Sequence, residues 1–276
     1  MSLTVTKPKN RSVLRKKLGK EYFCFRQRMN WMFGPEQLAT KRSSQQLPYQ
    51  LKEHQSILLR KLKDVDMHLQ HNKITNLRLA IERLDGIVIK PGEVFSFWKL
   101  VGRPTKQKGY LEGMTLSDGQ VTSGTGGGLC QLGNLIYWMS LHTPLSVVKR
   151  WRHSYDVFPD VNRKIPFGSG ATLSYNYIDL QLKNETNHDF QINLWLTKRH
   201  LKGSICCSVE ALNNYEVFER NHRFQLQWWG GYTRHNEIWR KVINQISQHE
   251  SEELITANHA IMMYNPLIEE VQNEKG

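Results

Sequence analysis

The sequence predicts an α+β fold in which N-terminal helices are followed by a mostly antiparallel β domain with one central helix. Apolar residues recur at helical spacing up to residue 85, and from residue 87 they alternate in short runs separated by turns. One helical pattern, residues 131–141, interrupts these runs directly after a Gly-Gly-Gly-Leu-Cys loop. The chain has 276 residues and is 39% hydrophobic, which is enough for a packed core.

Two amphipathic helices are expected before residue 85. The first follows from the spacing of Leu58, Leu62, Val65 and Leu69, and the second from that of Ile74, Leu77, Ile81 and Leu84. Asp85-Gly86 would end the second helix because glycine readily adopts the conformation that closes a helix.

Short strands are expected at residues 87–89, 94–98 and 147–148, where apolar residues cluster or alternate between turns. A hairpin is expected farther along. Its first strand would carry Ile178, Leu180 and Leu182, and its second Phe190, Ile192, Leu194 and Leu196. The polar residues 184–187 would form the turn between them.

Composition divides the chain into three segments: a basic arm (residues 1–46), a main domain (47–203) and a C-terminal extension packed on that domain (204–276). Lys and Arg crowd around aromatic residues in the arm. Such a segment can lie on an anionic membrane, so peripheral contact through residues 7–41 is one expectation. A solvated basic extension is the alternative.

The net charge of +13 favours anionic partners. No nucleic-acid reader motif accompanies the charge, so no nucleic-acid partner is expected. The sequence contains no apolar run of about 18 residues that would span a membrane, and no secretory signal pattern. We therefore expect a cytoplasmic protein, with a possible peripheral position at the inner membrane face.

The four cysteines are too few and too irregularly spaced for a disulfide framework, and free thiols are expected. Cys206 and Cys207 lie in an alternating pattern typical of a strand, which favours packing for Cys207. Neither the Cys nor the His spacing matches a zinc motif, so no metal and no cofactor is expected.

Cys130 is the strongest candidate for chemistry. It follows Gly126-Gly127-Gly128-Leu129 and opens a helix, where free N–H groups and the helix dipole would lower a thiol pKa. The backbone N–H groups of Gly127 and Gly128, with the amide of Gln131, are the expected oxyanion donors. The alternative is an ordinary glycine turn next to a packed cysteine.

A cysteine nucleophile needs a base, and two histidines follow it. His142 is twelve residues along the same helix, about 18 Å away, and is expected to cap the helix end. His153 is the better candidate because a strand after Pro144 would return the chain toward Cys130. Asp156, Asp160, Asn176 and Asp179 are candidates by position for the group that orients the base.

The segment from Lys90 to Leu196 resembles the VanW family of glycopeptide-resistance clusters and cell-wall proteins. The resemblance rests on residues 91–98, 126–131, 152–154, 171–175, 177–180 and 183–186, which occur in the family's order. It implies that Cys130 and His153 match the family's cysteine and histidine. The position where the family usually has an aspartate is Gly170 here.

Some members of that family are described as L,D-transpeptidases. The resemblance therefore implies a cysteine acyltransferase that acts on a peptidoglycan stem peptide or a lipid-linked precursor in glycopeptide resistance. The alternative is a non-catalytic accessory protein that binds precursor, membrane or a resistance enzyme.

Overall fold

The structure is a computed structural model that describes residues 12–59, 66–117, 119–152, 154–157 and 165–266. Its longer helices are α1 (Val13–Phe33), α2 (Met67–Leu84) and α4 (Cys130–Ser140); α3 (Phe97–Val101) and the 3-10 helix η1 (Lys106–Lys108) are short. The strands are β1 (Tyr49–Ile57), β2 (Ile87–Ile89), β3 (Val94–Ser96), β4 (Glu112–Ser117), β5 (Gln120–Thr125), β6 (Ser146–Lys149), β7 (Tyr155–Asp156), β8 (Gln181–Lys183), β9 (Phe190–Leu196), β10 (His200–Cys207), β11 (Asn213–Leu226), β12 (Tyr232–Asn244) and β13 (Glu250–Met262). The α+β class is confirmed.

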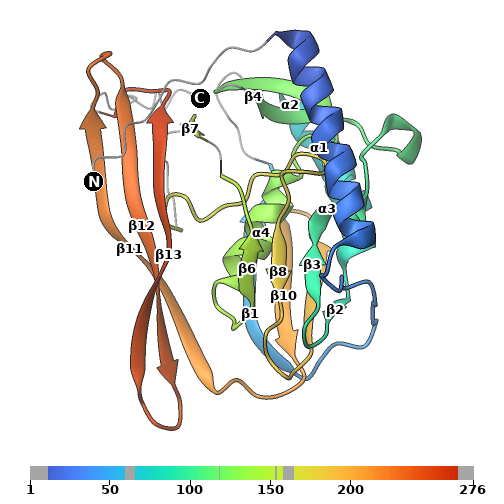
Figure 1. The fold of residues 1–276 in the computed structure, drawn as a ribbon, viewed down its shortest axis with the longest axis vertical. Helices are drawn as coiled ribbons and strands as arrows, with labels where there is room; N and C mark the ends of the chain where they lie inside the picture. The colour runs from blue at the N-terminus through green and yellow to red at the C-terminus, as the bar shows by residue number, and fades with distance from the viewer. Residues whose placement is uncertain (1–11, 60–65, 118, 153, 158–164, 267–276) are drawn as a thin grey trace.

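Four sheets make up the β structure. Their strand orders are β1-β10-β9-β2, β11-β12-β13-β7, β3-β8-β6 and β4-β5, and nearly all pairs are antiparallel. Helix α4 packs against β1 and β10, and α2 against β9. Figure 1 shows α4 in the middle of the molecule, between the first sheet and the long β11–β13 strands.

Helix α4 forms the centre of the hydrophobic core. Leu132, Leu135, Ile136 and Met139, the residues that predicted it, are all buried. Because these residues recur every three or four positions, they give the helix one continuous apolar face. On the neighbouring β12, Arg240 donates hydrogen bonds to the carbonyls of Leu141 (3.3 Å) and Thr143 (2.8 Å) just after the helix ends.

Several predicted elements are confirmed. Strands β2 and β6 and the helices α2 and α4 lie where the patterns placed them. Cys206 and Cys207 are buried on β10, and all four cysteines are free. The predicted strand 94–98 is shorter, because Ser96 caps helix α3 by accepting a hydrogen bond from the Lys99 N–H.

Two predictions are wrong. The first predicted helix is not formed as expected, because Leu58 directly follows strand β1 and Leu69 belongs to α2, which begins only at Met67 and is capped by Asp66. Leu62 and Val65 lie outside the described residues. The predicted hairpin at residues 178–196 is also absent. Strand β8 pairs with β3 and β6, whereas β9 pairs with β10 and β2, so the turn at 184–187 connects two different sheets.

The C-terminal strands β11, β12 and β13 form a long antiparallel sheet, and β7 joins its edge in parallel. A buried ion pair between Arg234 of β12 and Asp156 of β7 (3.3 Å) lies in this region. The aromatic pair Trp228 and Trp229 occupies the β11–β12 turn, where Trp228 is almost fully exposed. Among the described helices, none is both long and apolar enough to cross a membrane.

Candidate functional site

Cys130 is the first residue of α4 and the only one of the four cysteines that is not fully buried. Its thiol lies against the backbone of Leu173: the Leu173 N–H donates to Sγ at 3.4 Å, and Sγ lies 3.8 Å from the Leu173 carbonyl. A backbone N–H that donates to sulfur favours the thiolate, whereas a carbonyl acceptor favours the protonated thiol. The site can therefore hold both protonation states.

Burial of the sulfur raises the pKa of the Cys130 thiol above its ordinary value, and the N–H of Leu173 offsets this only in part. This corrects the expectation of a lowered pKa from the helix N-terminus. The loss of solvation disfavours the charged form more strongly than the helix end stabilises it. At neutral pH the thiol is thus protonated in this structure.

The three glycines before Leu129 fit a crowded loop. Gly126 and Gly128 adopt positive φ values of 78° and 91°, which other residues rarely tolerate. A Cβ on Gly127 would lie 2.1 Å from the carbonyl oxygen of Gly113, and one on Gly128 would lie 2.3 Å from Cγ of Lys73. These glycines are required for close packing as well as for their backbone conformation.

Two of the three expected oxyanion donors are engaged in internal hydrogen bonds. The Gly127 N–H donates to the Gly124 carbonyl at 3.0 Å. The Gln131 amide donates to Ser56 Oγ and to the Ile57 carbonyl, both at 2.9 Å, and so ties α4 to β1. An oxyanion role for Gly127, Gly128 and Gln131 stays a prediction, and for the Gly127 N–H and the Gln131 amide it requires these bonds to open.

Asn76, a fully buried residue of α2, anchors the glycine loop. Its amide donates to the carbonyls of Gly127 (2.9 Å) and Leu111 (3.0 Å), and its Oδ1 accepts from the Leu111 N–H at 2.8 Å. One side chain therefore satisfies three backbone groups on two segments. It fixes the loop that precedes Cys130 against the start of β4.

The predicted base, His153, lies outside the described residues. His142 caps the end of α4 as expected: its Nδ1 lies 2.9 Å from the Trp138 carbonyl, and burial lowers its pKa to about 4. Trp151 is described, and its carbonyl accepts from the Thr172 N–H at 2.8 Å. The segment 151–152 therefore lies beside residues 172–173, whose backbone contacts the Cys130 thiol.

The candidate orienting groups have other partners. Asp156 pairs with Arg234, and Asn176 donates to the Cys24 carbonyl at 3.3 Å. Asp179 is buried and accepts hydrogen bonds from Ser96 Oγ (2.6 Å) and the Trp98 N–H (3.0 Å). Asp160 lies outside the described residues.

Gly170 is closely packed under a side chain from α4. A Cβ at this position would lie 2.6 Å from Oδ1 of Asn134, and that oxygen accepts a hydrogen bond from the Ala171 N–H at 2.7 Å. On the other side, Arg150 Nε donates to the Gly170 carbonyl at 2.8 Å. Asn134 and Arg150 thus hold the loop segment that presents Leu173 to Cys130.

The structure reveals three site residues that the sequence analysis missed: Asn76, Asn134 and Leu173. Asn76 falls among the apolar residues of a predicted amphipathic helix, and a polar residue on that face is a usable signal of a buried hydrogen-bond role. Asn134 and Leu173 gave no signal, because they act through backbone contacts between segments distant in the sequence.

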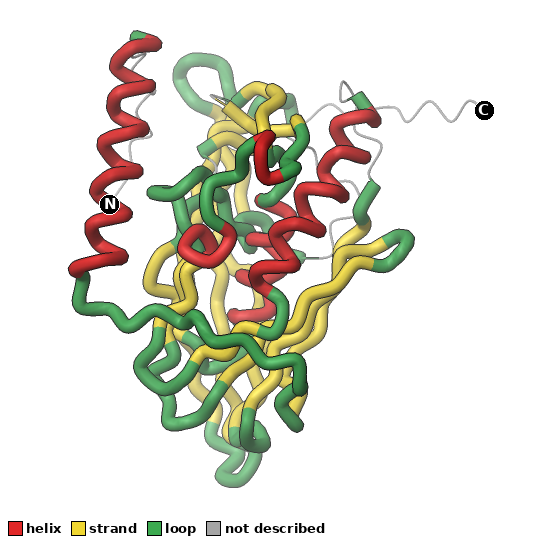
Figure 2. The backbone as a smooth tube through the Cα atoms, turned by 90° about the vertical axis from the view of Figure 1, so that its right-hand side faces the viewer, coloured by secondary structure: helices red, strands yellow, loops and turns green. Residues whose placement is uncertain are grey.

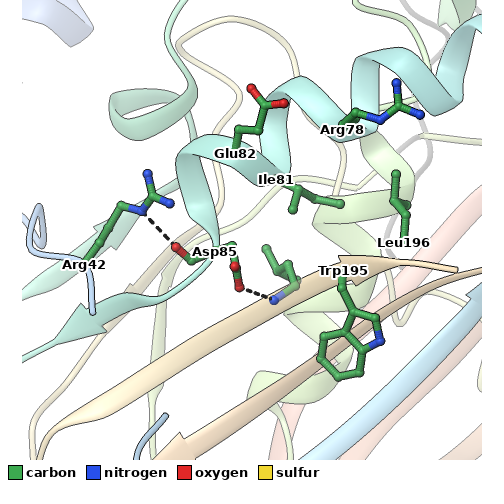
Figure 3. Close-up of a pocket in the computed structure, with 8 residues that line it drawn as sticks. Arg42, Arg78, Ile81, Glu82, Asp85, Trp195 and Leu196 are labelled. Carbon is green, nitrogen blue, oxygen red and sulfur yellow. Dashed lines mark hydrogen bonds between the residues drawn. The ribbon is translucent and has the colours of Figure 1, made fainter. Parts of the chain in front are cut away.

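A separate groove lies on the surface between α2 and β9. Its volume is about 430 Å³, and its walls include Arg42, Arg78, Glu82 and Asp85 above the side chain of Trp195. Figure 3 shows that Arg42 and Asp85 are tied together through the Asp85 carbonyl. The residues lining this groove do not include Cys130 or any other part of α4.

The chain is similar to known proteins over its central part. Residues 72–206 match the family model described as "VanW like protein". The chain is 39% identical over 171 residues to "Vancomycin B-type resistance protein VanW" of Enterococcus faecalis, which covers 62% of this chain and 62% of that protein. It is 31% identical over 117 residues to "Uncharacterized protein YoaR" of Bacillus subtilis, which covers 42% of this chain and 37% of that protein.

The matches therefore span less than two thirds of the length of either relative. No solved structure matches the chain. The family match includes the glycine loop, α4 and the segment that contacts the Cys130 thiol.

Proposed function

The chain belongs to the VanW family, and from that membership and the Cys130 site we propose that it is a cysteine acyltransferase of peptidoglycan stem peptides in glycopeptide resistance. One observation carries the proposal: the thiol of Cys130 stands at the first residue of α4 and accepts a hydrogen bond from the Leu173 N–H. A helix start and an N–H donor both stabilise negative charge that develops on sulfur during attack.

The proposed reaction has two steps. The Cys130 sulfur attacks an amide carbonyl of the donor stem, the C–N bond breaks, and the leaving amine takes the proton that the thiol gave up. The acyl group is then held as a thioester. An amine of a second stem attacks this thioester, the new amide forms, and the sulfur leaves as a thiolate that recovers a proton.

A base is needed because the resting thiol is protonated. Burial raises the pKa of Cys130, so a neutral group must remove its proton as the sulfur attacks. We assign this role to His153 from the family resemblance. Since the proton moves only when substrate is present, such a thiol resists adventitious oxidation and alkylation at neutral pH.

A second candidate function is that of a non-catalytic accessory protein that binds a stem peptide or lipid-linked precursor. The hydrogen bonds already made by the Gly127 N–H and the Gln131 amide favour it, because a resting enzyme usually presents preformed donors to its substrate. In that case the glycine loop and Cys130 are structural parts of the domain.

The test is a turnover assay with a tetrapeptide stem and an amine-bearing acceptor stem, with the cross-linked product measured by liquid chromatography and mass spectrometry. We expect Cys130→Ser and His153→Gln each to lower the rate by at least about a hundredfold. Cys24→Ser is the matched control, because the Cys24 thiol also contacts a backbone carbonyl, that of Tyr175 at 3.3 Å.

The accessory function is supported if the wild-type protein forms no product while a known transpeptidase in parallel does. A Cys130→Ser variant that retains the wild-type rate would instead contradict Cys130 as the nucleophile. Binding of the stem, measured by calorimetry, separates a non-catalytic binding protein from one with no affinity for this substrate.

A further inference from the structure

Helix α1 carries an apolar stripe that faces away from the rest of the protein. The stripe consists of Leu14, Leu18, Tyr22, Phe25, Met29 and Met32, and we call it the outer stripe. Five of these six side chains are more than 60% exposed. Their spacing of three and four residues places them within an arc of roughly 80° on the helix surface. An apolar stripe of this kind normally faces a core.

The opposite face of α1 is already in contact with the body of the protein. Cys24 and Gln27 are buried, and Trp31 packs against the hydrophobic core. The Cys24 thiol lies 3.3 Å from the Tyr175 carbonyl, and Lys149 Nζ donates to Gln27 Oε1 at 2.7 Å. These contacts fix the rotation of the helix, so the outer stripe is left on the outside.

Figure 1 shows α1 at the front of the molecule, and Figure 2, turned by 90°, shows it along one edge. No sheet or other helix lies over its outward side in either view. The stripe is therefore an apolar surface without a partner among the described residues.

Charge identifies what would cover the stripe. Helix α1 contains six basic residues, Arg15, Lys16, Lys17, Lys20, Arg26 and Arg28, against one acidic residue, Glu21. Glu21 forms an ion pair with Arg103 at 2.9 Å. A second copy of this helix would bring like charge against like charge, whereas an anionic surface is complementary to it.

We propose that α1 is an interfacial helix that lies on an anionic lipid surface, with the outer stripe in the boundary between headgroups and acyl chains. A leucine, methionine and aromatic stripe flanked by Lys and Arg is the composition of helices that lie in a membrane surface. The helix is about 31 Å long at 1.5 Å per residue. The stripe therefore extends over nearly the whole helix.

The docked face of α1 contacts the segment that leads to the Cys130 site. Phe23 stacks near Tyr177 with ring centroids 5.6 Å apart, and Asn176 donates to the Cys24 carbonyl. Residues 175–177 follow Leu173, whose backbone contacts the Cys130 thiol. Lipid bound to α1 would thus lie on the side of the molecule that carries this segment.

The test is flotation of the full chain with vesicles of 30% phosphatidylglycerol in phosphatidylcholine, and with vesicles of phosphatidylcholine alone. We expect the wild type to bind the anionic vesicles and to be released as salt is raised. Leu18→Glu combined with Phe25→Glu should weaken binding by at least about tenfold, because it places charge in the apolar boundary. Both side chains are exposed, so the fold is unaffected.

The matched control is Ile246→Glu combined with Leu212→Glu. These side chains are 80% and 59% exposed. Ile246 lies between β12 and β13 and Leu212 directly before β11, elements that Figure 1 shows on the other side of the molecule from α1, so this variant should bind as the wild type does. Circular dichroism should show that both variants are folded.

The proposal is overturned if the outer-stripe variant binds as tightly as the control, or if the wild type does not bind anionic vesicles. If light scattering shows that the wild type is dimeric and the outer-stripe variant is monomeric, the outer stripe contacts a second copy of the chain instead. Membrane binding is measured without substrate, so its result tests the membrane proposal independently of the proposed acyl transfer.

Discussion

Asn76→Ala is expected to destabilise the protein strongly through the glycine loop. The substitution removes three hydrogen bonds and leaves the Leu111 N–H and the Gly127 carbonyl without this partner, whereas the Leu111 carbonyl keeps the bond from the Gly126 N–H. Each bond contributes about 1 kcal/mol net, and a buried group left without a partner costs about 1–3 kcal/mol. Because Asn76 is fully buried, we expect a loss of about 3–5 kcal/mol in the free energy of unfolding.

The assay is urea denaturation followed by tryptophan fluorescence and circular dichroism. Asn72→Ala is the matched control: it lies one turn earlier on α2, and its amide makes an exposed hydrogen bond to the Glu112 carbonyl at 2.8 Å. We expect the control to lose less than about 1 kcal/mol. Equal losses for the two variants would refute the role of Asn76 as the buried anchor of the loop.

Three further predictions concern charge and space near the site. Burial raises the pKa of Asp179 to about 6, so this carboxyl holds its proton more tightly in the folded protein than in the unfolded chain, and its contribution to stability falls by roughly 2 kcal/mol as pH rises from 4 to 6. Asp179→Asn should remove that slope in denaturation at several pH values; an unchanged slope would contradict the assignment. Gly128→Ala should lower the free energy of unfolding at least twice as much as Gly92→Ala in the same assay. Both glycines have a positive φ, but only a Cβ at position 128 would clash with Lys73; equal losses would disprove the clash. The rate of Cys130 alkylation by iodoacetamide, measured by peptide mass spectrometry, should rise about tenfold per pH unit from 7 to 9, since burial raises its pKa; a plateau below pH 8 would contradict this.

The central helix and the buried short strands could be predicted because their apolar spacing is local. The apolar face of α4 follows from the spacing of its own residues, Leu132, Leu135, Ile136 and Met139, and does not depend on the surrounding elements. The same reasoning failed for Leu58 and Leu69, which it placed on one helix: Leu58 directly follows β1, whereas Leu69 belongs to α2. Helical spacing alone therefore does not show that a helix is continuous.

Sheet assignment could not be predicted from the sequence. Alternation shows that residues 181–183 and 190–196 are strands, but the pairing partners are chosen by long-range packing. A polar turn between two strands is compatible with a hairpin and equally with a crossing between sheets. The turn was therefore compatible with the expected hairpin, but tertiary packing directs its two strands into different sheets.

For the candidate site, the sequence indicated where Cys130 lies in the fold but not its environment. The glycine loop and the helix start placed Cys130 correctly, because both are local features. Its contact with Leu173 and the burial that raises its pKa depend on a segment 43 residues away. The expected direction of the thiol pKa was wrong because the helix end was weighed without the burial of the sulfur.

The most direct test of acyl transfer at Cys130 is intact-protein mass spectrometry after incubation with a tetrapeptide stem, in the wild type and in Cys130→Ala. Cys130→Ala removes the sulfur with little change in volume, so it should stay folded. We predict an adduct of acyl-donor mass on the wild type alone, mapped to the peptide that contains Cys130. No adduct on the wild type, or the same adduct on Cys130→Ala, would contradict the proposal that Cys130 is the nucleophile.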